Sequence, residues 1–162
     1  MIPKDKDPGD NWNVTVYTAP VAKGRPRARR MGNFVRMYTP QKTVTFERAV
    51  ESAALSALDI RVIDFPVRVD ILAVFSRPKR LTRKKDPQGL LWKPTRPDSD
   101  NLRKAVLDGL ACVLTDDALV VDGRTCKVYG AKGQEPMVKI NIRRAPDLPE
   151  GVTADFGLVD FR

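Results

Sequence analysis

Residues 66–75 read Pro-Val-Arg-Val-Asp-Ile-Leu-Ala-Val-Phe, and this stretch decides the fold class. Apolar side chains dominate it, which is typical of a long strand largely buried in a sheet. The next regular segment is a helix expected from Ser99 or Asp100 to about Ala111. Its buried stripe is formed by Leu102, Val106, Leu110 and, on a neighbouring row, Leu107. A buried strand followed by an amphipathic helix indicates a chain that packs both element types around one core.

The flanking segments extend this pattern in both directions. Upstream, a helix is predicted to begin with Thr39 as its N-cap and Pro40 as its first residue, and to end near Leu58. Further strands are predicted at residues 13–18, 34–38, 119–121, 126–129 and 137–142. Residues 23–30, which are rich in Lys and Arg, are then the expected tip of a hairpin between the first two of these strands. We predict an α/β (α+β) fold in a single domain, with one mixed β-sheet and two main helices.

The length of 162 residues fits one domain of ordinary size. We place a flexible N-terminus at residues 1–12, the folded domain at residues 13–144 and a C-terminal tail at residues 145–162. No stretch resembles a signal peptide or the ~18 to 20 apolar residues of a membrane span. We therefore expect a soluble, cytoplasmic protein without a membrane partner.

The composition excludes several kinds of catalytic chemistry. The chain has no histidine, which rules out serine or cysteine nucleophiles activated by imidazole and any zinc site that contains histidine. Cys112 and Cys126 are too few for an all-cysteine zinc site and too far apart for a CxxC redox pair. We expect them to be reduced and buried, and a disulfide is the alternative. The 29 Lys and Arg against 20 Asp and Glu give a net charge of +9, which favours a polyanionic partner.

Basic side chains concentrate in two segments. Residues 11–46 contain seven basic residues and no acidic one. Residues 77–97 contain eight basic residues against Asp86 alone, show no clean period, and are expected to be functional or disordered. Ten of these residues are the candidate DNA contacts: Lys23, Arg25, Arg27, Arg29, Arg30, Lys79, Arg80, Arg83, Lys84 and Lys85. For each one the alternative is an ordinary solvated surface charge.

The sign of the charge reverses between residues 98 and 122. Six aspartates face only Arg103 and Lys104 there: Asp98, Asp100, Asp108, Asp116, Asp117 and Asp122. Asp98 and Asp100 lie two residues apart at the start of the predicted helix, so both can face one cation. The six residues after the helix span up to about 20 Å, enough to return Asp117 along a helix of about 16 Å. Carboxylate oxygens of this kind suit Mg2+, which together with substrate phosphate would make a nuclease centre.

Each of these residues also has a purely structural interpretation. One carboxylate at the start of the helix is explained by an N-cap, supplied by Asp98, Ser99 or Asp100. Lys104 can pair with Asp100 or Asp108 on a solvated helix face. Asp116 and Asp117 can form a turn. The residue types alone leave both interpretations open.

Several motifs follow one another in a consistent order from about residue 14 to residue 143. They are Lys23-Gly-Arg-Pro-Arg27, Tyr38-Thr-Pro-x-Lys-Thr43, Arg96-Pro-Asp-Ser-Asp-Asn-Leu-x-Lys104 with Asp108-x-Leu110, and Asp116-Asp117-x-x-Val120-Val121. In this combination the chain resembles the RusA family of Holliday-junction resolvases from bacteria and phages. The resemblance implies a RusA-like domain and a homodimeric crossover junction endodeoxyribonuclease that depends on Mg2+, with Mn2+ as a substitute. It also implies that Asp98, Asp100 and Asp117 hold the metal, with Asp116 as the alternative third ligand, and that Lys104 assists.

The expected reaction is hydrolysis of branched DNA by paired symmetric nicks, in DNA recombination and repair. Metal-activated water is the expected nucleophile, and Lys104 would offset charge on the scissile phosphate. Trp92 and Phe34 are candidates for stacking on unpaired bases, although packing in the core is the favoured interpretation for Phe34. A dimer presents two sites to the two equivalent strands of a four-way junction, and Phe46 with its helix face is a guess for the interface.

Two other classes of protein remain in competition. The tract Lys23–Arg30 could serve a non-catalytic DNA-binding protein, because Gly24-Arg25-Pro26 resembles the core of an AT-hook. A basic RNA-binding protein is the second alternative. Neither class needs the aspartates.

Overall fold

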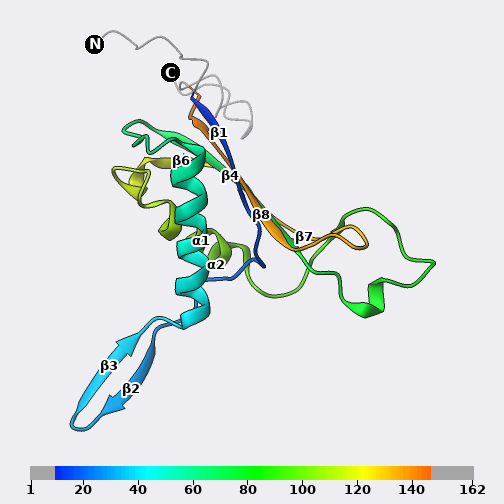
Figure 1. The fold of residues 1–162 in the computed structure, drawn as a ribbon, viewed down its shortest axis with the longest axis horizontal. Coiled ribbons are helices and arrows are strands. Elements are labelled where there is room, and N and C mark those ends of the chain that lie inside the picture. Colours follow the sequence, from blue (N-terminus) through cyan, green and yellow to red (C-terminus); the bar gives the residue numbers. More distant parts are fainter. Residues whose placement is uncertain (1–9, 147–162) are drawn as a thin grey trace, which may run out of the picture.

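The computed structural model describes residues 10–146, which form a mixed sheet, a separate hairpin and two α-helices (Figure 1). The sheet contains β1 (Asn11–Val16), β4 (Val67–Phe75), β5 (Leu91–Trp92), β6 (Val120–Asp122), β7 (Thr125–Tyr129) and β8 (Met137–Arg144). The hairpin consists of β2 (Arg27–Met31) and β3 (Phe34–Tyr38). The helices are α1 (Gln41–Ala57) and α2 (Ser99–Leu110), and η1 (Lys79–Leu81) and η2 (Asp117–Leu119) are short 3-10 turns.

Strand β4 is the centre of the sheet, as its apolar sequence predicts. The strand order is β1-β8-β4-β7-β5, and β6 pairs with the start of β4, ahead of β7 on the same edge. Strands β6 and β7 run parallel to β4, whereas β8 runs antiparallel to it. This mixed sheet with two helices confirms the predicted fold class.

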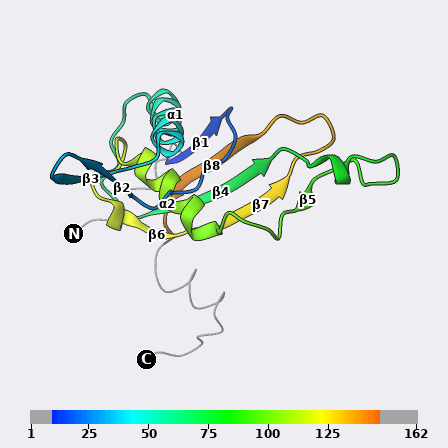
Figure 2. The same cartoon turned by 90° about the horizontal axis from the view of Figure 1, so that it is seen from below.

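The core lies between one face of the sheet and the two helices (Figure 2). Along β4 buried residues alternate with partly exposed ones, so that Val67, Val69 and Ile71 point to the helices. Helix α1 contributes Phe46, Val50 and Ala54, and α2 contributes Ala105, Val106 and Leu110. Charged and amide side chains such as Asp70 and Asn141 occupy the opposite face, which neither α1 nor α2 covers.

Helices α1 and α2 approach each other closely at one glycine. A Cβ atom on Gly109 would lie 2.6 Å from the Cβ atom of Val50 and 2.8 Å from the carbonyl oxygen of Glu47. Because real Cβ atoms essentially never make such contacts, only glycine fits at this crossing. The close approach holds α2, which carries the first two candidate aspartates at its start, against α1.

Four expectations about the N-terminal part of the chain are wrong. The hairpin joins residues 27–31 to residues 34–38, whereas β1 pairs with β8 at the other end of the chain. Phe34 is 80% exposed and therefore does not pack in the core. Phe46 is 2% exposed and lies inside the core, so it cannot form a dimer interface. Helix α1 begins one residue later than predicted, with Pro40 at its N-cap.

The two cysteines, Cys112 and Cys126, are both free and partly buried. Within residues 10–146, no helix is long and apolar enough to span a membrane. Most of the predicted flexible N-terminus and of the predicted tail lies outside the described residues.

Candidate active site and nucleic-acid interface

The loop that leads into α2 is held by two lysines. The Lys93 ammonium group donates to Thr95 Oγ1 at 2.7 Å and to the carbonyl of Arg96, and it lies 4.8 Å from the ring centre of Phe75. Lys127 on β7 donates to the carbonyls of Thr95 at 3.0 Å and Pro97 at 2.7 Å. Three consecutive carbonyl groups just before Asp98 are therefore tied to the sheet. Lys93 is only 8% exposed, so this basic residue of the segment 77–97 is a buried structural cation.

Asp98 and Asp100 lie at the start of α2 with their side chains open to solvent. Asp98 occupies the N-cap, but its carboxylate accepts no capping hydrogen bond. Asp100 is the acidic residue of the first helical turn. Among the described residues neither carboxylate forms an ion pair or a side-chain hydrogen bond. The helix N-terminus adds partial positive charge, which stabilises anions there.

Lys104 lies one turn after Asp100 on the same exposed side of α2. Its side chain makes no ion pair with Asp100 or Asp108 within the described part of the chain, although the spacing would allow both. Asp108 instead bonds to Lys23, with 2.5 Å between Nζ and Oδ2. An ammonium group near two free carboxylates at a helix start is suited to meet a phosphate group.

Asp116 and Asp117 lie at the other end of α2. The backbone of residues 113–115 pairs with Ile63, which accepts from the amide of Thr115 at 3.1 Å and donates to the carbonyl of Val113 at 2.8 Å. This pairing holds the chain beside the last turn of α2, where Asp117 borders a hollow with Leu107 and Asp108. Asp116 caps η2, because its Oδ1 accepts from the amide of Ala118 at 2.8 Å.

The three aspartates therefore do not meet within one chain. Helix α2 spans twelve residues, about 18 Å, and separates the pair at its start from Asp117 beyond its end. In residues 10–146, no three Asp, Glu, Cys or His side chains gather into a group that could hold a metal ion. The two open carboxylates still fit Mg2+, which proteins commonly bind through one or two carboxylates together with substrate phosphate.

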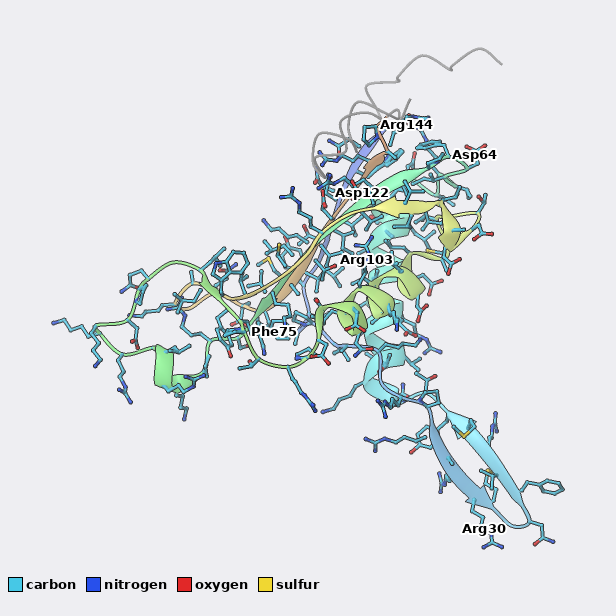
Figure 3. The ribbon with its side chains drawn as sticks, turned by 180° about the vertical axis from the view of Figure 1, so that it is seen from behind. Arg30, Asp64, Phe75, Arg103, Asp122 and Arg144 are labelled. Atoms are coloured by element: carbon cyan, nitrogen blue, oxygen red, sulfur yellow. The ribbon has the colours of Figure 1, made fainter. Side chains whose placement is uncertain are left out.

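The other two aspartates of the acidic segment already have basic partners, Asp108 in Lys23 and Asp122 in Arg68. Asp122 accepts from Arg68 at 2.9 Å, and its carbonyl accepts from Arg103 of α2 at 3.3 Å (Figure 3). Arg68 also binds Asp70, a residue that sequence reasoning did not single out. Burial raises the pKa of Asp70, but the hydrogen bonds from Arg68 and from the backbone amide of Arg124 outweigh it, so the pKa lies below its usual value. Arg68 lies 54 residues from Asp122 in the sequence, and Asp70 lies 54 residues from Arg124, so no local pattern predicts these two pairs.

Lys23 is anchored and does not extend into solvent. Its Nζ lies 2.6 Å from Oε1 of Glu47 on α1 and 2.5 Å from Oδ2 of Asp108 on α2. Burial acts to lower the pKa of Lys23, but the hydrogen bonds with Asp108 and Glu47 outweigh it and hold the pKa above its ordinary value. The backbone amide of Lys23 also donates to the carbonyl of Asn101, the residue after Asp100, at 2.8 Å.

Eight of the remaining nine candidate DNA contacts stand on two projecting segments, and Arg25 lies just before the first of them. We call residues 27–38, the β2–β3 hairpin, the arm, and residues 77–90 the basic loop. Figures 1 and 2 show them at opposite ends of the molecule with α2 between them, and Arg30 marks the tip of the arm in Figure 3. All nine side chains are exposed: Arg25, Arg27, Arg29, Arg30, Lys79, Arg80, Arg83, Lys84 and Lys85.

The side chains of Arg77 and Lys132 order the basic loop by hydrogen bonds to its backbone, so the loop is not the disordered segment that the sequence allowed. Arg77 donates to the carbonyls of Gly130 at 2.9 Å, Pro87 at 2.5 Å and Gly89. Lys132 donates to the carbonyls of Arg83 and Asp86, both at 2.8 Å. These bonds hold the loop so that its other basic side chains point outward.

The chain is similar to known proteins over most of its length. The family model described as endodeoxyribonuclease RusA matches residues 18–143. The chain is also similar to the uncharacterized protein YqaN of Bacillus subtilis (strain 168), with 36% identity over 140 residues. That match covers 83% of this chain and 96% of YqaN.

Proposed function

Because the chain belongs to the RusA family of endodeoxyribonucleases, we propose that it resolves four-way DNA junctions by paired symmetric nicks and depends on Mg2+. The family points to endodeoxyribonuclease activity, and branched DNA is the substrate that we propose. The proposed setting is recombination and repair in the cytoplasm of a bacterium or a phage-infected host.

One observation carries the proposal most directly. In a protein with a net charge of +9, the carboxylates of Asp98 and Asp100 are left without a cationic partner among the described residues. They lie between two basic projections, which suit a DNA backbone. We propose that both bind Mg2+, or Mn2+ in its place. The bound ion would activate water for attack on the phosphodiester and stabilise the leaving oxygen. Lys104 would neutralise charge on the phosphate.

We propose Asp117 as a third ligand that comes from a second copy of the chain. Within one chain α2 separates it from the other two, whereas a symmetric dimer can bring the end of one α2 to the start of the other. Asp116 is the weaker alternative, because its carboxylate already caps η2. Each half of the homodimer would then complete the site of its partner.

The first experiment compares cleavage of a four-way junction and a linear duplex, with Mg2+ and with EDTA. We expect Mg2+-dependent nicks in the junction and none in the duplex. Asp100→Asn should reduce nicking at least about 100-fold, because loss of an outer partner of a metal ligand alone costs about 10- to 100-fold. Glu135→Gln is the control, because it makes the same carboxylate-to-amide change at an exposed residue between β7 and β8. Binding without Mg2+-dependent nicking would support a non-catalytic DNA-binding protein, and preference for RNA would support the RNA-binding alternative.

A mixing experiment tests the contribution of the second copy. Asp100→Asn and Asp117→Asn chains are each expected to be inactive. In a mixed dimer built across two copies, one of the two sites contains no substitution, so mixing should restore nicking. If each site were built within one chain, every site in the mixture would carry a substitution and activity would not return.

A further inference from the structure

The arm is the one strand pair in residues 10–146 that packs against no other sheet. Strands β2 and β3 pair only with each other, and all ten of their residues are exposed. An isolated two-stranded hairpin of this kind is marginally stable in water. Large apolar side chains nevertheless stand on it, with Phe34 80% exposed and Met31 58% exposed. Exposed apolar side chains on an unsupported arm indicate a partner.

The strand register divides the arm into two unlike faces. Directly opposite residues share a face, so Arg27 with Tyr38, Arg29 with Arg36, and Met31 with Phe34 lie on one side. The other side carries Ala28 with Met37 and Arg30 with Val35. The first face therefore combines a row of three arginines with an apolar pair at the tip. The tip turns at Gly32, whose φ of 64° glycine adopts without strain.

The base of the arm is fixed close to the candidate active site. Lys23 bonds through its backbone to Asn101, one residue after Asp100, and through its side chain to both helices. The amide of Gly24 donates to Oγ1 of buried Thr43 at 3.3 Å, and α1 begins directly after the arm. Five residues of strand carry the tip about 16 Å from this base. A molecule bound along the arm is thereby presented to the start of α2.

We propose that the arm inserts the Met31–Phe34 tip into the branch point of DNA while its arginine face holds the flanking phosphates. The inference rests on the proposed function and names the element that selects branched DNA. Charge favours a polyanion as the occupant, because residues 11–46 contain no acidic side chain. A second copy docked arm against arm would bring two arginine faces together, and like charges would repel. A two-stranded ribbon is narrow enough to enter a groove of DNA, and DNA-binding proteins are known to insert apolar side chains between bases.

Selectivity follows from where DNA is already unstacked. In a linear duplex, insertion of Phe34 requires two stacked base pairs to separate, and this cost cancels the gain from stacking on the ring. At a branch point the stacking is interrupted, so the ring gains a contact at little cost. Stacking of one base on an aromatic side chain changes affinity about 5- to 150-fold. The arginines are expected to contribute to binding of both substrates, because both present phosphates to them.

The test measures binding of labelled four-way junction and linear duplex by fluorescence anisotropy in EDTA, which prevents metal-dependent cleavage. Phe34→Ser should weaken junction binding about 5- to 150-fold and leave duplex binding unchanged. Val35→Ser is the matched control, because Val35 is the next residue, is 67% exposed and lies on the opposite face. Replacing Arg27, Arg29 and Arg36 by Gln should weaken both substrates and reduce the salt slope of log K by about 3.

A second readout places the tip in the DNA. A 2-aminopurine base at the branch point should change its fluorescence when the wild-type protein binds, and this change should disappear with Phe34→Ser and persist with Val35→Ser. Equal weakening of junction and duplex by Phe34→Ser, or no weakening at all, would overturn the insertion while Mg2+-dependent nicking of the junction continued. A wild-type protein that neither prefers nor cuts the junction would refute the proposed function and this inference together.

Discussion

Replacing Lys93 by methionine should loosen the loop that presents Asp98. Methionine has nearly the same length and keeps the apolar stem, so the change removes the ammonium group specifically. That group bonds to Oγ1 of Thr95 and the carbonyl of Arg96 and lies over the rings of Phe75 and Tyr129, at 4.8 and 5.4 Å from their centres.

The expected loss follows from these contacts. Hydrogen bonds from a charged donor contribute about 1.5–3 kcal/mol each and a cation–π contact about 0.5–2 kcal/mol. The cost of burying the ammonium group, several kcal/mol, offsets most of this sum. The carbonyl of Thr95 keeps its bond to Lys127, whereas the carbonyl of Arg96 loses the partner that the structure gives it. We expect a net loss of about 1–3 kcal/mol, or a fall in Tm of about 2–12 °C.

The assay combines thermal unfolding with junction cleavage. Lys93→Met should lower Tm and reduce cleavage more than junction binding, because the loop positions Asp98 while the arm and the basic loop stay intact. Lys42→Met is the matched control, since Lys42 is exposed in the first turn of α1 and has no side-chain partner among the described residues. An unchanged Tm together with wild-type cleavage would refute the role assigned to Lys93.

Two further substitutions test the packing and the electrostatics. Gly109→Ala should destabilise the protein by about 1–3 kcal/mol in urea unfolding, because the new methyl group would lie 2.6 Å from the Cβ atom of Val50; a stabilised variant would contradict this packing. Asp70 has a lowered pKa, so the stability that its ion pairs contribute is present above the unfolded pKa of about 3.9 and is lost as pH falls through the folded value. Asp70→Asn should therefore destabilise the protein at pH 7 and have little effect in strong acid, and an equal effect at both pH values would show that the loss is not electrostatic.

The predictable part of the fold is the part with a strong local pattern. Residues 66–75 and the buried side of α2 are recognisable from the sequence, because burial makes apolar residues recur at regular spacing. The partner of β1 was not predictable in the same way, because β8 lies at the far end of the chain and a strand carries no sign of its neighbour. The strand β2 is rich in arginine and fully exposed, so no core face marks it as a strand.

The candidate site also has a part that the local sequence predicts and a part that depends on the tertiary fold. The placement of Asp98 and Asp100 at the start of α2 is a local feature, and the sequence predicts it. The pairing of Asp108 with Lys23 and of Asp122 with Arg68 depends on the tertiary fold, so the acidic segment contained fewer free carboxylates than its count suggests. The position of Asp117 is fixed by pairing of residues 113–115 with Ile63, which chain length alone does not reveal.

The start of α2 is held rigidly, while the arm and the basic loop project away from it. This arrangement suits a substrate of irregular shape. Lys93 and Lys127 tie the preceding loop to the sheet, and Gly109 lets α2 pack tightly on α1, so the carboxylates stand on a rigid support. Catalytic groups need such support, because a displacement of about 1 Å can cost about 100-fold in rate. The arm and the basic loop project from opposite ends of the molecule (Figure 1). Recognition can therefore follow the shape of the DNA while the geometry of the candidate centre stays fixed.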